Sequence, residues 1–285
     1  MPKSTRFNTR LLKQQKGVAM HRWIFFNTIL LGIMISANAM GFDATGIWDY
    51  DEHSHTNTCG VKIDPDSGEM VILQNTTTFL IVGQEDSTYG TFSDVTYTYT
   101  DSWCDYSGTV DATVVLTLSS ANSGTGTVNW TWNGAGGPCA GSHQLNIAKN
   151  TSPSNPAYNA TGKWNFNQSN SWTTCGSSST PPRESGYLVI TQTDSRISAI
   201  DDEQDSYDGF VSGATYFVVG SSLELGGRTS VLYEIDLASS TQGSGEAKFV
   251  WDDDCDFCNG GWDISVGKAV TTNINPAIPI ILLNE

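Results

Sequence analysis

Two halves of this chain repeat one pattern, and this internal repeat constrains the fold more than any other feature of the sequence. Gly46-Ile47-Trp48 in the first half matches Gly162-Lys163-Trp164 in the second half at a shift of 116 residues. Farther along, the shift is 119 and stays constant for about 50 residues. The matched pairs there include Tyr97 with Tyr216, Gly124 with Gly243, Gly126 with Gly245, Trp132 with Trp251 and Cys139 with Cys258. A constant shift of this length indicates two copies of one structural unit.

The repeat divides the chain into five parts. They are a signal segment at 1–39, a first repeat unit at 40–149, a linker at 150–159, a second repeat unit at 160–270 and a tail at 271–285. The linker combines Pro153 and Pro156 with asparagine and serine, and such a stretch does not hold a sheet register. We therefore expect two domains joined by a short irregular connection.

Alternating apolar residues predict that both units are all-β. Val128, Trp130 and Trp132 share one face of an expected strand, and Ala247, Phe249 and Trp251 repeat that face in the second copy. A slip of one residue would turn each face outward, so the agreement in phase supports the register. Short turns between about seven to eight strands per unit favour two tandem antiparallel up-and-down β-barrels. The alternative is a pair of β-sandwiches.

The opening motif of each unit resembles a known superfamily. Gly46 and Trp48 form a G-x-W on the first expected strand, and Gly162 and Trp164 repeat it. This motif is similar to that of lipocalins and avidins, the calycin superfamily. The resemblance implies that the glycine lets the first strand bend and that the tryptophan plugs one end of the barrel. Lipocalins also carry an arginine near the last strand, where this chain has Lys149 and Lys268.

The amino terminus predicts export. Six basic residues precede or flank an apolar run at 23–35, and Ala37-Asn38-Ala39 follows as a signal-peptidase pattern. The run is too short for a helix across a bilayer of roughly 30 Å, so we expect cleavage and no membrane span. The predicted location is secreted or periplasmic.

Cleavage makes the protein more acidic. Six of the 14 basic residues lie before position 40 and none of the 30 acidic residues does, which leaves eight basic residues and a formal charge of −22. Such a surface repels nucleic acid and anionic membranes, so neither is an expected partner. The sequence leaves the oligomeric state open.

The six cysteines predict disulfides, because an exported protein folds in an oxidising compartment. The repeat pairs equivalent residues and thereby suggests Cys59–Cys139 and Cys175–Cys258 as one staple per unit. Cys104 and Cys255 have no counterparts in the repeat. They pair with each other, or Cys255 competes with Cys258 for Cys175. A redox or zinc role for the C-x-x-C at 255–258 is the weaker alternative.

Inward-facing aromatic residues are the candidate ligand-binding set. They are Tyr97, Tyr99, Trp130 and Trp132 in the first unit, and Tyr216, Tyr233, Phe249, Trp251 and Trp262 in the second. A hollow barrel lined in this way would bind a small apolar or sugar ligand. The alternative is a barrel that these side chains fill, since eight strands enclose little more than their own side chains.

Metal ligands are the second kind of candidate. His53 and His55 follow Asp51 and Glu52, a combination that suits zinc or copper, but the matching residues 167–171 contain no ligand. We therefore favour a solvated polar loop there. The acidic runs at 201–208 and 252–256 lack the spacing of a calcium-binding EF-hand. His143 shares a face with Leu145 and Ile147 and is expected in the core. We assign no metal and no cofactor.

The leading functional hypothesis is a secreted, non-enzymatic binding protein with lipocalin-like barrels, because no nucleophile and base stand in a recognisable catalytic motif. One alternative is a cell-surface or extracellular interaction protein with solid barrels and acidic, calcium-binding loops. Another is a carbohydrate-binding module that uses Trp103 or Trp172 on its surface.

Overall fold

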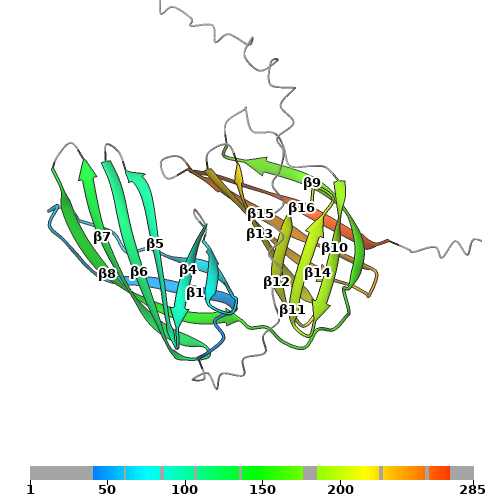
Figure 1. Ribbon diagram of the computed structural model, residues 1–285. Coiled ribbons are helices and arrows are strands. Elements are labelled where there is room, and N and C mark those ends of the chain that lie inside the picture. The colour runs from blue at the N-terminus through cyan, green and yellow to red at the C-terminus, as the bar shows by residue number, and fades with distance from the viewer. Residues whose placement is uncertain are drawn as a thin grey trace, which may run out of the picture. The chain divides into compact units, whose positions relative to one another are not determined.

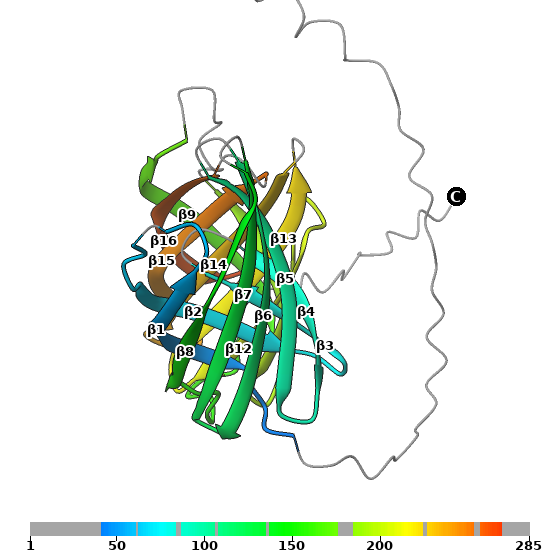
Figure 2. The same cartoon turned by 90° about the vertical axis from the view of Figure 1, so that its left-hand side faces the viewer.

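A computed structural model of the chain describes residues 41–60, 62–83, 87–105, 108–134, 137–175, 185–224, 227–253 and 257–269. These residues form sixteen strands in two closed antiparallel barrels, one in each repeat unit (Figures 1 and 2). Barrel 1 contains β1 (Gly46–Asn57), β2 (Ser67–Gln74), β3 (Thr78–Val82), β4 (Ser87–Ser93), β5 (Thr96–Asp105), β6 (Gly108–Ser120), β7 (Ser123–Gly134) and β8 (Cys139–Thr151). Barrel 2 contains β9 (Gly162–Thr173), β10 (Ser185–Thr193), β11 (Arg196–Asp201), β12 (Ser206–Ser212), β13 (Thr215–Glu224), β14 (Gly227–Leu237), β15 (Gln242–Asp252) and β16 (Phe257–Lys268).

Each barrel has the predicted up-and-down order. Every strand pairs with the next one along the chain, and β1 pairs with β8, as β9 does with β16, to close the circle. Closure removes the free sheet edges that a sandwich would keep. The prediction of two all-β, up-and-down barrels is thus confirmed over the sandwich alternative, with eight strands in each unit.

One end of each barrel is closed by the tryptophan of the G-x-W motif, and we call it the tryptophan end. Trp48 is fully buried, its indole N–H donates to the Ala44 carbonyl oxygen at 2.6 Å, and Lys149 Nζ lies 4.9 Å from the centre of its ring. In barrel 2, Trp164 donates to Ala160 at 2.6 Å and lies under Lys268. The lysines therefore cover the tryptophans with a cation.

A second set of hydrogen bonds at this end is also duplicated. The Gln74 side-chain oxygen accepts the Ala44 amide at 2.8 Å, and Gln192 accepts the Ala160 amide at 2.8 Å. Buried backbone groups need such partners, because an unpaired one costs about 1–3 kcal/mol. This requirement explains why the alanine before each motif and the glutamine of the next strand recur together in the sequence.

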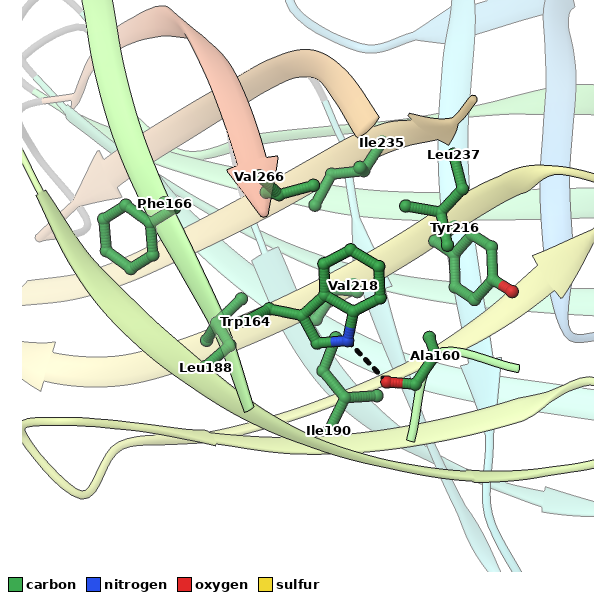
Figure 3. A pocket seen from close by; sticks show the side chains of 10 residues that line it. All are labelled: Ala160, Trp164, Phe166, Leu188, Ile190, Tyr216, Val218, Ile235, Leu237 and Val266. Atoms are coloured by element: carbon green, nitrogen blue, oxygen red, sulfur yellow. Dashed lines mark hydrogen bonds between the residues drawn. The ribbon is translucent and has the colours of Figure 1, made fainter. Parts of the chain in front are cut away.

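The tryptophan ends are filled with side chains. In barrel 2, Trp164, Phe166, Leu188 and other apolar residues surround a cavity of about 20 Å³ (Figure 3). That volume holds about one water molecule. The corresponding core of barrel 1 packs Trp48, Ile72 and Leu116 just as closely, with each at most 1% exposed.

Apolar residues also occur on the outside of some strands. In β2, four consecutive residues from Met70 to Leu73 are buried, so both faces of this strand are covered. A third apolar cluster contains outward residues of β2, β3, β12 and β13: Val71, Leu73, Leu80, Val82, Phe210, Phe217 and Val219. Burial on both faces explains the continuous apolar runs in these strands, where simple alternation would leave one face polar.

The structure contains both disulfides that the repeat suggests, Cys59–Cys139 and Cys175–Cys258, with Cα atoms 5.2 and 4.9 Å apart. Each joins the end of the first strand of a barrel to the start of its last strand, and we call this the disulfide end. Cys104 is also disulfide-bonded, whereas Cys255 lies outside the described residues. The signal segment 1–39 and residues 271–285 of the tail likewise lie outside them.

β8 runs to Thr151, two residues into the expected linker, because Ile47 pairs with Thr151.

The part of the chain that the structure describes contains no helix with the length and apolar character needed to span a membrane.

Candidate functional site

The disulfide end of barrel 1 differs from its tryptophan end in burial. Tyr97, Leu116 and Ile147 near the tryptophan end are almost fully buried. Inward side chains nearer Cys59–Cys139 are only half-buried, among them Tyr99, Trp130, Trp132 and His143. Solvent therefore reaches inward-facing side chains at the disulfide end of barrel 1.

A β-bulge in β1 sets which side chains point inward there. His53 pairs with Gln144 and Thr56 with Ser142, so Ser54 and His55 together face the single residue His143. Ser54 has a left-handed backbone, with φ of 58°. The extra residue reverses the alternation of the strand, so that Glu52 and His55 both point inward although three positions separate them. The solvated loop expected for residues 53–55 is therefore wrong, because β1 continues to Asn57.

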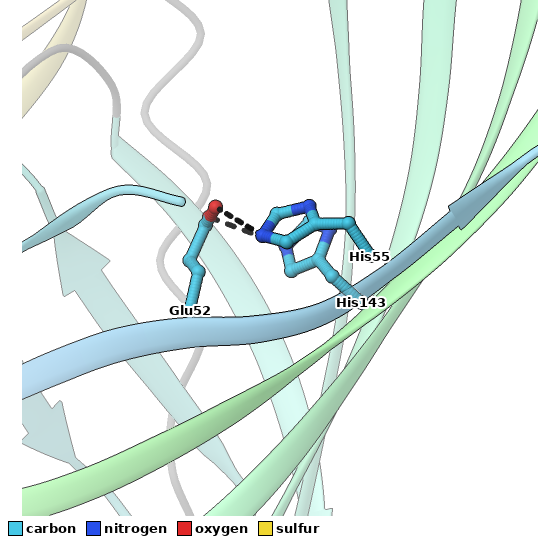
Figure 4. Close-up of side chains that lie close together, drawn as sticks. All are labelled: Glu52, His55 and His143. Carbon is cyan, nitrogen blue, oxygen red and sulfur yellow. Dashed lines mark ion pairs between the residues drawn. The ribbon is translucent and has the colours of Figure 1, made fainter. Parts of the chain in front are cut away.

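Three side chains with metal-binding atoms, from β1 and β8, meet inside barrel 1 (Figure 4). His143 Nε2 lies 3.2 Å from Glu52 Oε1, and His55 Nε2 lies 3.6 Å from Glu52 Oε2. The two imidazole rings stack with centres 4.8 Å apart and planes inclined by 23°. Their parallel arrangement directs both Nε2 atoms towards one carboxylate, as Figure 4 shows. We call Glu52, His55 and His143 the triad.

The triad is enclosed but reachable. The side chains of His55, His143 and Glu52 are 9%, 13% and 19% exposed. Among the described residues, no hydrogen-bond partner is found for either ring nitrogen of His55 or for Nδ1 of His143. A buried polar atom without a partner is costly, and such groups in a native protein usually have a bound water, ion or ligand.

The carboxylate of Glu52 is held in its charged form. Burial opposes ionisation, but the hydrogen bond and charge of His143, the Asp66 amide and the charge of His55 together lower the pKa of Glu52. The Asp66 amide lies 3.3 Å from Glu52 Oε2. A charged carboxylate facing two imidazoles is the form that binds a cation.

Barrel 2 has the same bulge with different side chains. Asn170 has φ of 53°, and the register shift between Ser169–Asp263 and Trp172–Gly261 repeats that of barrel 1. The residues equivalent to Glu52, His55 and His143 are Gln168, Ser171 and Trp262. The backbone is therefore duplicated, whereas the charged and imidazole groups belong to barrel 1.

The predicted aromatic candidates of barrel 1 fall into two groups. Tyr97 is buried at the tryptophan end, where its single hydroxyl proton is shared between two acceptors, the Phe42 carbonyl oxygen at 2.7 Å and the Gln74 side-chain oxygen at 2.6 Å. Tyr99, Trp130 and Trp132 lie nearer the disulfide end and are half-buried. Tyr99, Trp130 and Trp132 therefore lie at the same end of barrel 1 as the triad, whereas Tyr97 does not.

The candidates of barrel 2 are more deeply packed. Tyr216, Tyr233 and Trp262 are at most 6% exposed, and the last two contact each other edge to face. Phe249 and Trp251 are half-buried. Tyr216 donates its hydroxyl to the Tyr158 carbonyl, as Tyr97 does to Phe42 in barrel 1.

The remaining candidates lie on the surface. Trp103 and Trp172 are 40% and 54% exposed and stand on strands of different barrels. Asp201 accepts the amides of Glu203 and Asp205 at 2.9 Å each and closes the turn between β11 and β12. Of the acidic run at 252–256, the structure describes Asp252 and Asp253, whereas Asp254 and Asp256 lie outside the described residues.

His143 and His55 contact each other, although 88 positions separate them in the sequence. Sequence reasoning treated the two histidines as unrelated. It placed His143 in the core with Leu145 and Ile147, and the histidine does point inward. The pairing of β1 with β8 brings it beside Glu52, which is opposite Leu145 in the register. The signal that could have found the triad is the closure of the barrel, which makes the first and last strands neighbours.

Comparisons with known proteins give a weak structural likeness. No protein family matches the sequence, and no curated protein does. Among solved structures, a protein of unknown function from the DUF3598 family of Nostoc punctiforme is similar, with 13% identity and a TM-score of 0.25. The match covers 80% of this chain and 97% of that protein.

Proposed function

We propose that this is an exported, non-enzymatic binding protein with two calycin-like barrels, whose ligand contacts the inward side chains at the disulfide end of barrel 1. One observation carries the proposal: His55 is nine-tenths buried there, yet its ring nitrogens have no hydrogen-bond partner among the described residues. A bound partner would complete these groups, and a native fold seldom leaves them incomplete.

The chemistry of this end favours a ligand with polar groups over a purely apolar one. Trp130 and Tyr99 offer apolar faces, and the triad offers one carboxylate and two imidazoles. Small-molecule sites usually combine apolar walls with a few such polar groups. The 20 Å³ cavity of barrel 2 is far below the ~300–1,000 Å³ of typical ligand pockets, so we do not assign ligand binding to the tryptophan end of that barrel.

Export is the second part of the proposal. Two disulfides fit an oxidising compartment, and the basic and apolar segment before Ala39 fits a signal peptide. The calycin relationship rests on the G-x-W motif, the capping lysines and the closed eight-stranded barrels.

Native mass spectrometry of the protein from its own secretion route tests the proposal. We expect a chain that begins at Met40 and carries additional mass that denaturation releases. Trp130→Ala should lower ligand retention, whereas Phe249→Ala at the equivalent position of barrel 2 should not. An uncleaved chain contradicts the export, and ligand retention that Trp130→Ala leaves unchanged contradicts the assigned end.

A further inference from the structure

We propose that Glu52, His55 and His143 bind one divalent first-row transition-metal ion, for which Zn²⁺ is the best candidate, and leave a coordination position open towards the barrel interior. This inference deepens the proposed function and rests on it for the choice of barrel end. It is carried by the geometry, the unpartnered nitrogens and the comparison between the barrels.

The spacing of the triad matches the spacing of zinc ligands. Bonds of about 2.0–2.1 Å in a tetrahedral arrangement place neighbouring ligand atoms roughly 3.3 Å apart. The observed separations of 3.2 and 3.6 Å between Glu52 and the two imidazoles bracket this value, and all the ligand atoms lie within 4.8 Å of one another. The triad therefore places three candidate zinc ligands close together on β1 and β8.

The alternative is that hydrogen bonds alone hold the triad together. In that arrangement two imidazole rings, stacked 4.8 Å apart, would share one carboxylate. His55 is nine-tenths buried, and its nearest approach to Glu52 is 3.6 Å, beyond hydrogen-bonding distance. Both ring nitrogens of this buried imidazole would then lack a hydrogen-bond partner among the described residues. A metal ion would bind both Nε2 atoms and the carboxylate together.

The second barrel shows that the fold alone does not require these residues. It keeps the bulge at Asn170 and the pairing of its first and last strands. In place of the triad it has Gln168, Ser171 and Trp262, of which only the amide and hydroxyl oxygens could contact a cation. Side chains that suit a transition metal therefore occur in barrel 1, on a backbone that barrel 2 forms without them.

The number of protein ligands indicates how the ion would act. Structural zinc sites are usually closed by four protein ligands, whereas three protein ligands leave a position for water or for another molecule. The half-buried Trp130 and Tyr99 lie on the same inner surface. A ligand of the proposed binding function would then coordinate the ion through an anionic or other electron-donating group.

Titration of the chelator-treated, disulfide-bonded protein with Zn²⁺ tests the inference by calorimetry. We expect one ion per chain, an increase in the melting temperature on binding, and visible d–d bands when Co²⁺ replaces Zn²⁺. His143→Ala, His55→Ala and Glu52→Gln should each weaken Zn²⁺ binding by about 100-fold or more and remove the thermal stabilisation. Melting of the metal-free variants reports separately whether they fold.

His53→Ala is the matched control, because His53 lies two residues from His55 and outside the triad. It should bind Zn²⁺ like the wild type, as should Gln168→Ala in barrel 2. The inference is overturned if folded His55→Ala and His143→Ala variants bind Zn²⁺ as the wild type does. It is also overturned if binding is abolished instead by Asp205→Asn, in the carboxylate group that Asp201, Glu203 and Asp205 form in the turn between β11 and β12. If the metal-free wild type binds no Zn²⁺ but still retains an organic ligand through Trp130, the inference fails and the proposed function stands.

Discussion

At the scale of single residues, Gly46 shows why the opening motif needs glycine. Its φ is 150°, a value that L side chains rarely adopt, and a Cβ at this position would lie 2.4 Å from the Thr151 carbonyl oxygen. The backbone conformation and this close contact both oppose a side chain.

Gly46→Ala should therefore destabilise the protein by more than 1–2 kcal/mol, an approximate cost of an unfavourable backbone region alone. Gly162→Ala is the comparison, because φ is 131° there but the nearest atom is the flexible Lys268 Cε at 3.0 Å. Urea unfolding of both variants measures the difference. Equal losses would show that the Thr151 contact contributes nothing.

Tyr97 provides a pH-dependent prediction. Burial, together with the charge of Asp43, raises the pKa of Tyr97 to about 12, compared with 10.0 for an ordinary tyrosine. The folded state favours the neutral phenol, so this stabilisation is complete below pH 10 and is lost as the pH rises to about 12.

Tyr97→Phe removes the hydroxyl and should lower stability near neutral pH by about 1 kcal/mol. The difference from the wild type should then narrow as the pH rises from 10 to 12, because only the wild type has this phenol to ionise. Denaturant unfolding at several alkaline pH values measures the effect. A constant difference across this range would contradict it.

At the scale of strands, the bulge at Ser54 decides where His55 points. Ser54→Val places a β-branched residue in a left-handed conformation, which such residues strongly avoid. We expect the variant to lose about 1–2 kcal/mol of stability and to bind Zn²⁺ roughly tenfold more weakly. Ser54→Gly should preserve the affinity, because glycine adopts this conformation readily.

Asn170 supplies the control in barrel 2, where the bulge is equivalent. Asn170→Val should lower stability by a similar amount and leave Zn²⁺ binding unchanged. Unfolding curves and calorimetric titrations of the three variants separate these effects. The role of the bulge would be refuted if Ser54→Val and Asn170→Val had the same effect on Zn²⁺ affinity.

The bulge also marks how far sequence reasoning could go. Alternation in strands such as β7 and the repeat predicted two barrels of about seven to eight strands, because inward residues agree in phase between the copies. Alternation alone places Glu52 on one face of β1 and His55 on the other. The extra residue of the bulge reverses this alternation. The sequence gives no sign of the bulge, because position 54, which has a left-handed backbone, is a serine and not a glycine. The contact with His143 depends in addition on the register of β1 against β8. Barrel closure, which the sequence predicts, makes these strands neighbours, but spacing alone does not give their register.

At the scale of the whole molecule, duplication separates what the fold needs from what function would need. The capping lysine, the buried tryptophan and the glutamine–alanine hydrogen bond occur in both barrels. The triad occurs in barrel 1, with neutral residues at its equivalent positions. Features shared by the copies stabilise the barrel, and a difference at equivalent positions is where distinct binding properties are expected to arise.

The two disulfides test this division, because they occupy equivalent positions. Cys59–Cys139 and Cys175–Cys258 close loops with sequence separations of 80 and 83 residues. In the chain-entropy model, loops of this size are worth about 4 kcal/mol each. Replacing either pair by serines should therefore cost a similar free energy of unfolding.

Their effects on Zn²⁺ should differ. Cys59→Ser with Cys139→Ser releases the ends of β1 and β8, which carry the triad, and should weaken Zn²⁺ binding by about tenfold because the ligands are less well oriented. Cys175→Ser with Cys258→Ser releases the equivalent strands of barrel 2 and should leave the affinity unchanged. Calorimetry on both double variants, at a temperature where each is folded, measures this. Equal losses of Zn²⁺ affinity in the two double variants would contradict this prediction.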